Sequence, residues 1–142
     1  MKAPGPSSHR YEGGVAALEF ALMLPFLLMV LFGIIDVSMI LCDKAVITNA
    51  SREAARAGVV LRVPQWNRAQ IQNVALNYTQ NNLITGGTPA SAGAVADYIS
   101  QTSGSRLTVT VTYTYQGFVL GSIFSAITGP VTISAVTVMN YE

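Results

Sequence analysis

The residues that could carry chemistry are few and lie far apart in the sequence. His9 is the only histidine and Cys42 the only cysteine among 142 residues, so no His/Cys cluster has metal-ligand spacing and no intramolecular disulfide can form. Glu19 and Asp36, the first two acids after the N-terminal residues, are separated by about 25 Å if the segment is helical, so they cannot act on one substrate. No glycine-rich phosphate loop follows a predicted strand. The sequence predicts no enzyme, no cofactor, no metal site and no small-molecule substrate.

Composition and charge point toward a membrane rather than nucleic acid. The formal net charge is +1, and the cationic residues are scattered without a basic run. Charged residues make up 11% of the chain, against roughly 25% in ordinary soluble domains. The deficit is concentrated between Val15 and Leu41, where Glu19 and Asp36 are the only ionisable side chains.

This apolar run is long enough to cross a bilayer. Phe20 to Ile35 contains no charged residue, and a spanning helix needs about 20 predominantly apolar residues. A cleaved secretory signal would have an apolar core of about 7–15 residues followed by small residues at the cleavage site, and residues 37–42 offer no such site. We therefore predict a membrane anchor. Pro25 is expected to bend it, a defect that membrane helices tolerate.

The helical pattern continues beyond the apolar run. Apolar and small residues recur at spacings of three or four as far as Val59, which predicts one helix from about Val15 to about Val60. Ala50, Ala54 and Gly58 form a stripe of small residues at i, i+4 and i+8, which allows another backbone to approach closely. We predict helix packing at this stripe.

A second helix and two strands are predicted in the remainder. Asn67 suits an N-cap, and helical spacing continues to about Asn82; residues 86–93 have loop composition. Residues 107–115 alternate between apolar residues and threonine, as a half-buried strand does. A second strand starts at residues 131–135, where the later shift in apolar phase at Val136 and Val138 suggests a bulge.

An apolar connector separates these two strands. Its large side chains are Phe118, Val119, Leu120, Ile123, Phe124 and Ile127. It could be a short core helix or a patch resting on lipid, and core is favoured because a two-stranded sheet needs cover. The predicted fold class is α+β: a long N-terminal helix, transmembrane and then solvent-exposed, followed by a second helix and a small antiparallel sheet.

Two stretches and the C-terminal end give these elements a family likeness. The run GGVAALEFALMLPFLL, the segment ITNASREAARAG and the ending VTISAVTVMNYE resemble TadE-like pseudopilins, minor pilins of the Flp/Tad type IVb pilus system. The likeness covers essentially residues 10–142. Some relatives carry a cysteine pair in the distal domain, which is absent from this chain. The resemblance implies a pilin-like fold.

The resemblance assigns roles to four residues near the N-terminus. It implies cleavage by a prepilin peptidase between Gly14 and Val15, with Glu19 and Phe20 then fifth and sixth in the mature chain. Cleavage would create an α-ammonium at Val15, which Glu19 of a neighbouring subunit can neutralise. An unpaired charge in hydrocarbon costs about 2.5–3.5 kcal/mol on insertion scales. The alternative is a solvated carboxylate at the headgroup level.

The expected organisation follows from these assignments. Residues 1–14 are a leader, 15–42 a transmembrane and assembly helix, 43–62 its soluble continuation, and 63–142 a small periplasmic or extracellular α+β domain. The N-terminus is placed in the cytoplasm and the chain in the bacterial inner membrane, with the cell surface possible within a pilus. Asp36 is expected either to snorkel or pair with a basic group on a neighbour, or to occupy a solvated helix position near the outer interface.

Two functions remain in competition. The resemblance implies a minor pilin-like subunit that contributes to pilus assembly, secretion and tight adherence. Its implied partners are other pilin and pseudopilin subunits, the prepilin peptidase, an inner-membrane platform, an assembly ATPase and a secretin. The alternative is a permanently anchored, single-pass periplasmic interaction module that enters no pilus. Cleavage at Gly14 distinguishes the two.

Overall fold

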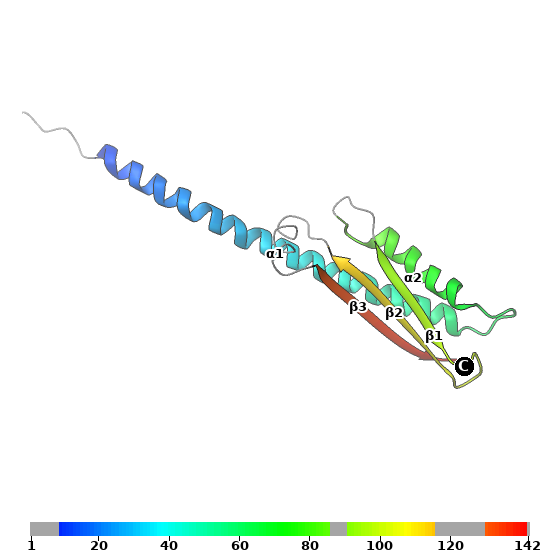
Figure 1. Ribbon diagram of the computed structural model, residues 1–142. Helices are drawn as coiled ribbons and strands as arrows, with labels where there is room; N and C mark the ends of the chain where they lie inside the picture. The colour runs from blue at the N-terminus through cyan, green and yellow to red at the C-terminus, as the bar shows by residue number, and fades with distance from the viewer. Residues whose placement is uncertain (1–8, 86–90, 116–129, 142) are drawn as a thin grey trace, which may run out of the picture. The chain divides into compact units, whose positions relative to one another are not determined.

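The computed structural model describes residues 9–85, 91–115 and 130–141. In chain order its elements are helix α1 (His9–Val59), helix α2 (Arg68–Asn82), and strands β1 (Ala92–Tyr98), β2 (Arg106–Tyr115) and β3 (Val131–Asn140) (Figure 1). This combination of two helices and a small antiparallel sheet confirms the predicted α+β fold class. The chain divides into two compact units, Met1–Ile35 and Asp36–Glu142, and α1 supplies residues to both.

In the first unit, α1 buries no face against other described residues. Every residue from 14 to 31 is exposed, including leucine, methionine and phenylalanine side chains on all sides of the helix. Helix α1 continues through Pro25, and it is long and apolar enough to cross a membrane. It begins at His9 rather than near Val15 as expected, because glycine weakens a helix by about 1 kcal/mol relative to alanine without removing a backbone donor.

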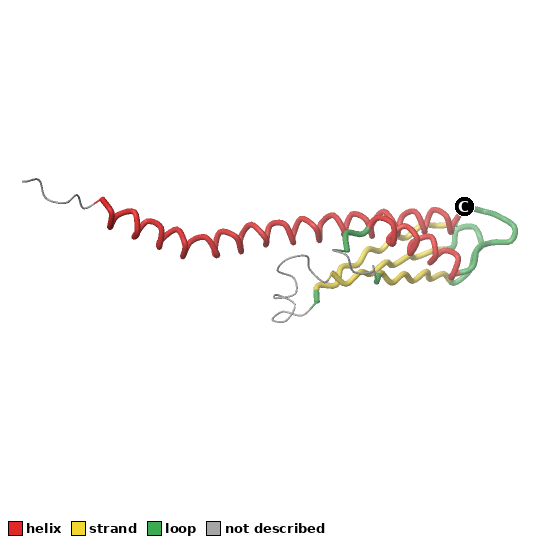
Figure 2. Tube along the Cα trace, turned by 90° about the horizontal axis from the view of Figure 1, so that it is seen from above, coloured by secondary structure: helices red, strands yellow, loops and turns green. Residues whose placement is uncertain are grey.

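The second unit has two layers. Its sheet has the order β1-β2-β3 and is antiparallel throughout. The α1 residues of this unit and α2 lie on the same side of the sheet, as Figure 2 shows. The side chains of β2 alternate as predicted: its odd-numbered positions from Leu107 to Tyr115 are buried, and its threonines lie on the other face.

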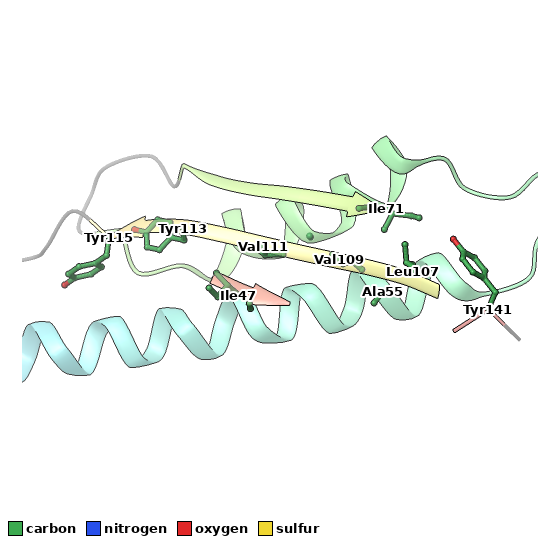
Figure 3. Packing of buried hydrophobic residues seen from close by; sticks show 13 residues of the cluster. Ile47, Ala55, Ile71, Leu107, Val109, Val111, Tyr113, Tyr115 and Tyr141 are labelled. Atoms are coloured by element: carbon green, nitrogen blue, oxygen red, sulfur yellow. The ribbon is translucent and has the colours of Figure 1, made fainter. Parts of the chain in front are cut away.

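The core lies between these layers. Figure 3 shows Ile47 and Ala55 of α1 and Ile71 of α2 beside the apolar residues of β2. Ile47, Ile71, Leu107, Val109 and Val111 are all fully buried. Burying one such aliphatic side chain contributes about 1.5–3 kcal/mol, so the apolar face of β2 stabilises the packing of both helices on one side of the sheet.

Helix α2 begins where its sequence signal lies. The Oδ1 of Asn67 accepts a hydrogen bond from the N–H of Gln70 at 2.9 Å, and the Gln70 side chain accepts one from the N–H of Asn67 at 2.9 Å. This reciprocal pair is a capping box, which satisfies two backbone donors that the first turn leaves without partners.

The predicted bulge in β3 is absent. The register with β2 is unbroken from Tyr115↔Val131 to Arg106↔Asn140. The apolar phase changes because Thr137 takes the inward position, while Val136 and Val138 point outward and are exposed. The inward hydroxyl of Thr137 has a buried partner in Ser51, at 2.7 Å, so a polar residue is stable there.

The sequence analysis did not predict strand β1, and two residues of the predicted loop 86–93 belong to this strand. Ala92 and Gly93 pair with Tyr113 and Thr112 of β2. The sequence AGAVADY has low intrinsic β-propensity, so its strand state comes from pairing with β2 and from the α2 residues that cover it. The apolar connector predicted from Phe118 to Ile127 lies outside the described residues.

Candidate functional site

The residues assigned to processing and assembly lie in the exposed apolar part of α1. Gly14, Val15, Glu19 and Phe20 are all exposed. A Cβ added at Gly14 would meet nothing within 4 Å. In the part of the chain that the structure describes, Glu19 makes no hydrogen bond or ion pair. Close packing within the chain therefore does not require a glycine at position 14. No partner among the described residues accounts for the charge of Glu19.

Val15 and Glu19 lie on one face of α1. They are four residues apart, a spacing that brings Cβ atoms within about 5–6 Å of each other in a helix.

The small-residue stripe is covered by the domain itself. Ala50 and Ala54 are fully buried, and Gly58 is buried as well. A Cβ at Gly58 would lie 2.6 Å from Leu107 Cδ2 and 2.9 Å from Ile71 Cδ1. The close approach that this stripe permits is therefore made by β2 and α2 of the same chain.

Polar contacts also join α1 to the sheet within the second unit. Tyr115 donates its hydroxyl to Asp36 Oδ1 at 3.2 Å. Further along the helix, Lys44 donates to the backbone oxygen of Ser134. Asp36 is buried, so the expectation that its carboxylate is solvated is wrong, and the carboxylate accepts the Tyr115 hydroxyl instead.

Asp43 of α1 is a buried charged residue that the sequence analysis did not identify. It is 0% exposed; its Oδ1 accepts a hydrogen bond from the N–H of Ile84 at 2.9 Å, and its Oδ2 has no hydrogen-bond partner among the described residues. Burial raises the pKa of Asp43 above its ordinary value of 3.8, and the bond from Ile84 lowers it by less. The available signal was spacing: Asp43 follows Asp36 by two helical turns and precedes the buried Ile47 by one.

The pKa of Tyr113, which lies near Asp43, is also shifted by burial. The pKa of Tyr113 is raised above 10.0, first by burial and then by the charge of Asp43. No group of three His, Cys, Asp or Glu side chains that could hold a metal ion occurs in the described ranges, and Cys42 is an exposed thiol.

Comparison with protein families adds a direct match for the first part of this site. Residues 14–56 match the family model for TadE-like protein. Over these residues the chain is similar to that family, and the match covers less than half of the chain. The TadE-like segment contains Gly14, Val15, Glu19 and Phe20, together with the first two residues of the small-residue stripe, Ala50 and Ala54.

No curated protein and no solved structure matches the chain. Residues 57–142 lie outside the family match, and the sheet and α2 are described from the structure alone.

Proposed function

We propose that the chain is a minor pilin-like subunit, a pseudopilin, of a Tad/Flp type IVb pilus assembly and secretion machine. A prepilin peptidase removes residues 1–14, residues within 15–42 anchor and assemble the subunit, and the rest forms a periplasmic domain. The observation that carries this proposal is the TadE-like match over residues 14–56. The apolar helix supports it, because side chains exposed on every side need lipid or other helices to cover them.

The proposed partners follow from the same helix. Before assembly the exposed run lies in the inner membrane, where the peptidase and the assembly platform act on it. During assembly the apolar side chains of neighbouring pilin subunits replace lipid around it. The subunit then contributes to pilus biogenesis and to adherence.

Cleavage at Gly14 is the decisive experiment. Mass spectrometry of the protein purified from cells with an active peptidase should find an N-terminus at Val15. Gly14→Leu should accumulate the uncut chain, because a bulky side chain hinders the peptidase at that position. Gly33→Leu is a matched control, since a Cβ at either glycine meets nothing within 4 Å. A wild-type chain that still begins at Met1 would overturn the proposal.

One observation favours the second candidate, a permanently anchored periplasmic interaction module. Helix α1 begins at His9, so the bond between Gly14 and Val15 lies inside a helix. Peptidases bind extended backbone, and this segment would have to unwind before cleavage. Gly13 and Gly14 make such unwinding easier, since each glycine weakens the helix by about 1 kcal/mol. An uncut, stably anchored chain would establish this alternative.

A further inference from the structure

Strand β3 forms one edge of the sheet, since among the described strands it pairs with β2 alone (Figure 1). One contact shows which of its residues turn their backbone groups away from β2. The backbone oxygen of Ser134 accepts a hydrogen bond from Lys44 of α1. A strand residue turns its N–H and C=O to the same side, and the next residue turns them to the other. Val136 and Val138 therefore also direct both groups away from β2.

This edge is open beyond Ser134. Outside the ladder with β2, no hydrogen bond within the described part of the chain reaches Val136 or Val138. Proteins protect sheet edges with charged residues, proline or bulges. The sequence of β3 contains no charged residue and no proline, and its register with β2 is unbroken. Such an edge is a template on which another strand can pair.

On the face of the sheet without helices, this edge is apolar. The side chains of Val136 and Val138 are 59% and 50% exposed. A strand added beside β3 would place every second side chain next to these valines, and cross-strand pairs of apolar residues stabilise a sheet. The edge therefore favours a partner strand with an apolar residue at alternate positions.

On the face that the helices cover, arginines flank the edge. A surface pocket there is lined by three charged residues of α1, Arg52, Glu53 and Arg56, and by uncharged residues of α1, α2 and β3, which are Asn49, Tyr78, Thr137 and Met139. Glu53 lies two residues after Ser51, about 200° around the helix from the contact between Ser51 and Thr137. Glu53 therefore faces away from β3, and the arginines remain beside it.

The charge balance along this edge is positive. Two arginines and one glutamate give the pocket a net charge of +1, and Lys44 adds a positive charge beside Ser134. The other described acids of this unit face other groups: Asp36 accepts from Tyr115, Asp43 accepts from Ile84, and Asp97 pairs with Arg68. Glu142, which follows the strand, lies outside the described residues. The helix side of the edge thus favours acidic side chains.

We propose that the edge of β3 binds an extended acidic segment of another protein as a fourth, antiparallel strand. Its alternate side chains are apolar beside Val136 and Val138 and acidic beside Arg52 and Arg56. Strand addition takes affinity from main-chain hydrogen bonds and specificity from alternate side chains. The inference concerns the domain from Asp36 onward and does not depend on pilus assembly.

The segment belongs to a different protein rather than to a second copy of this chain. Residues 131–140 contain no acid, so pairing of two β3 strands would leave the arginines without acidic partners and bring two positive flanks together. No two acids of this chain are two residues apart in the sequence, so no segment of it has the required alternation.

Synthetic peptides test the proposal with the full chain in detergent. The probe is a capped, fluorescent peptide as long as β3 in which valine and glutamate alternate, and the control peptide alternates valine and lysine. By anisotropy, the glutamate peptide should bind at least about tenfold more tightly. Hydrogen exchange at the N–H groups of Val136 and Val138 should slow, while that at Ala94 and Ala96, on the opposite edge strand β1, should not change.

Backbone methylation of the peptide separates strand pairing from charge attraction. In an antiparallel pair, the residues opposite Val136 and Val138 turn their N–H groups toward β3. These residues are the valines of the peptide, so N-methylation of its valines should abolish binding. N-methylation of its glutamates should leave binding unchanged, because their N–H groups point to solvent.

Substitutions in the protein test the charge. Arg52→Gln with Arg56→Gln should weaken binding of the glutamate peptide about tenfold, since two exposed ion pairs are lost. Arg106→Gln is the matched control, because Arg106 is also exposed but lies on β2, outside the pocket. The melting temperature should stay that of the wild type, because no buried side chain changes.

Four results would overturn the proposal. The first is no binding of the glutamate peptide to the folded wild type, and the second is equal affinity for the glutamate and lysine peptides. The third is binding that survives methylation of the valines. The fourth is protection of Ala94 and Ala96 without protection of Val136 and Val138, which would place the peptide on β1.

Discussion

At the scale of single residues, Gly58 shows how closely α1 packs against β2 and α2. Its missing side chain leaves space that Leu107 and Ile71 occupy, and both of these residues are fully buried. The sequence predicted close packing at Ala50, Ala54 and Gly58 from their spacing, but it could not name the element that approaches. That required the positions of β2 and α2, which depend on contacts distant in sequence.

Gly58→Val should therefore destabilise the domain. Its added Cβ would lie within 3 Å of two buried side chains, and overpacking of this kind costs about 1–3 kcal/mol. Thermal unfolding of the full chain in detergent measures the effect. Gly33→Val is the control, because a Cβ there meets nothing within 4 Å; equal melting temperatures for the two variants would contradict the packing described.

Asp43 makes stability depend on pH. Because burial raises its pKa in the folded state, the folded domain binds a proton more tightly than the unfolded chain does. The stability that this proton contributes is fully present below about pH 3.8 and is lost as pH rises through the higher folded pKa. Tyr113 of β2 and the N–H of Ile84 are the groups that face the carboxyl group.

Asp43→Asn should be more stable than the wild type at neutral pH, and the difference should vanish toward pH 3. The neutral amide oxygen can still accept the hydrogen bond from Ile84, while the buried charge is gone. Denaturant unfolding at a series of pH values checks this. Asp97→Asn provides the control: Asp97 is exposed and forms an ion pair with Arg68 at 3.4 Å, a contact worth about 0–1 kcal/mol. If the stability difference between Asp43→Asn and the wild type grew as the pH fell, the pKa of Asp43 would not be raised in the folded state.

At the scale of elements, the sequence revealed the structure where a single local pattern determined it. Strict alternation defined β2, and the Asn67 cap defined the start of α2. Strand β1 escaped because alanine and glycine carry little strand signal, and its state depends on its partner β2. The phase of β3 was misjudged for a related reason: Thr137 faces inward because Ser51, distant in sequence, is there to bond it.

The Ser51–Thr137 contact should couple α1 to β3 measurably. Ser51→Ala or Thr137→Val alone leaves one buried hydroxyl without this partner, and each should destabilise by about 1 kcal/mol. The double variant should cost less than the sum of the two, because both hydroxyls are removed together. A double-mutant cycle in denaturant gives the coupling energy. If the two single-variant changes in unfolding free energy simply added, the 2.7 Å contact would contribute nothing to the packing of α1 on β3.

At the scale of the whole molecule, the chain joins two parts with different requirements. The domain from Asp36 onward has its own buried core, whereas residues 14–31 are exposed on every side. Composition also differs between the two parts, because charge is nearly absent from residues 15–41 and ordinary in the residues that follow. The role of Glu19 could not be predicted from composition, since its proposed partner belongs to another subunit.

Glu19→Gln tests that role directly. Glutamine keeps the size and hydrogen-bonding capacity of glutamate but removes its charge, so the variant should insert into the membrane at least as well as the wild type. If Glu19 neutralises the Val15 ammonium of a neighbour, the substitution leaves that ammonium uncompensated in an apolar bundle, which is the costly outcome when one partner of a buried pair is removed. Membrane level and cleavage after Gly14 should be unchanged, while cross-linking to other pilin subunits and adherence of the cells should fall. Glu53→Gln is the matched control, because Glu53 is an exposed glutamate on the same helix but lies in the domain. Normal cross-linking and adherence in Glu19→Gln cells would leave Glu19 as a headgroup-level carboxylate without a partner subunit.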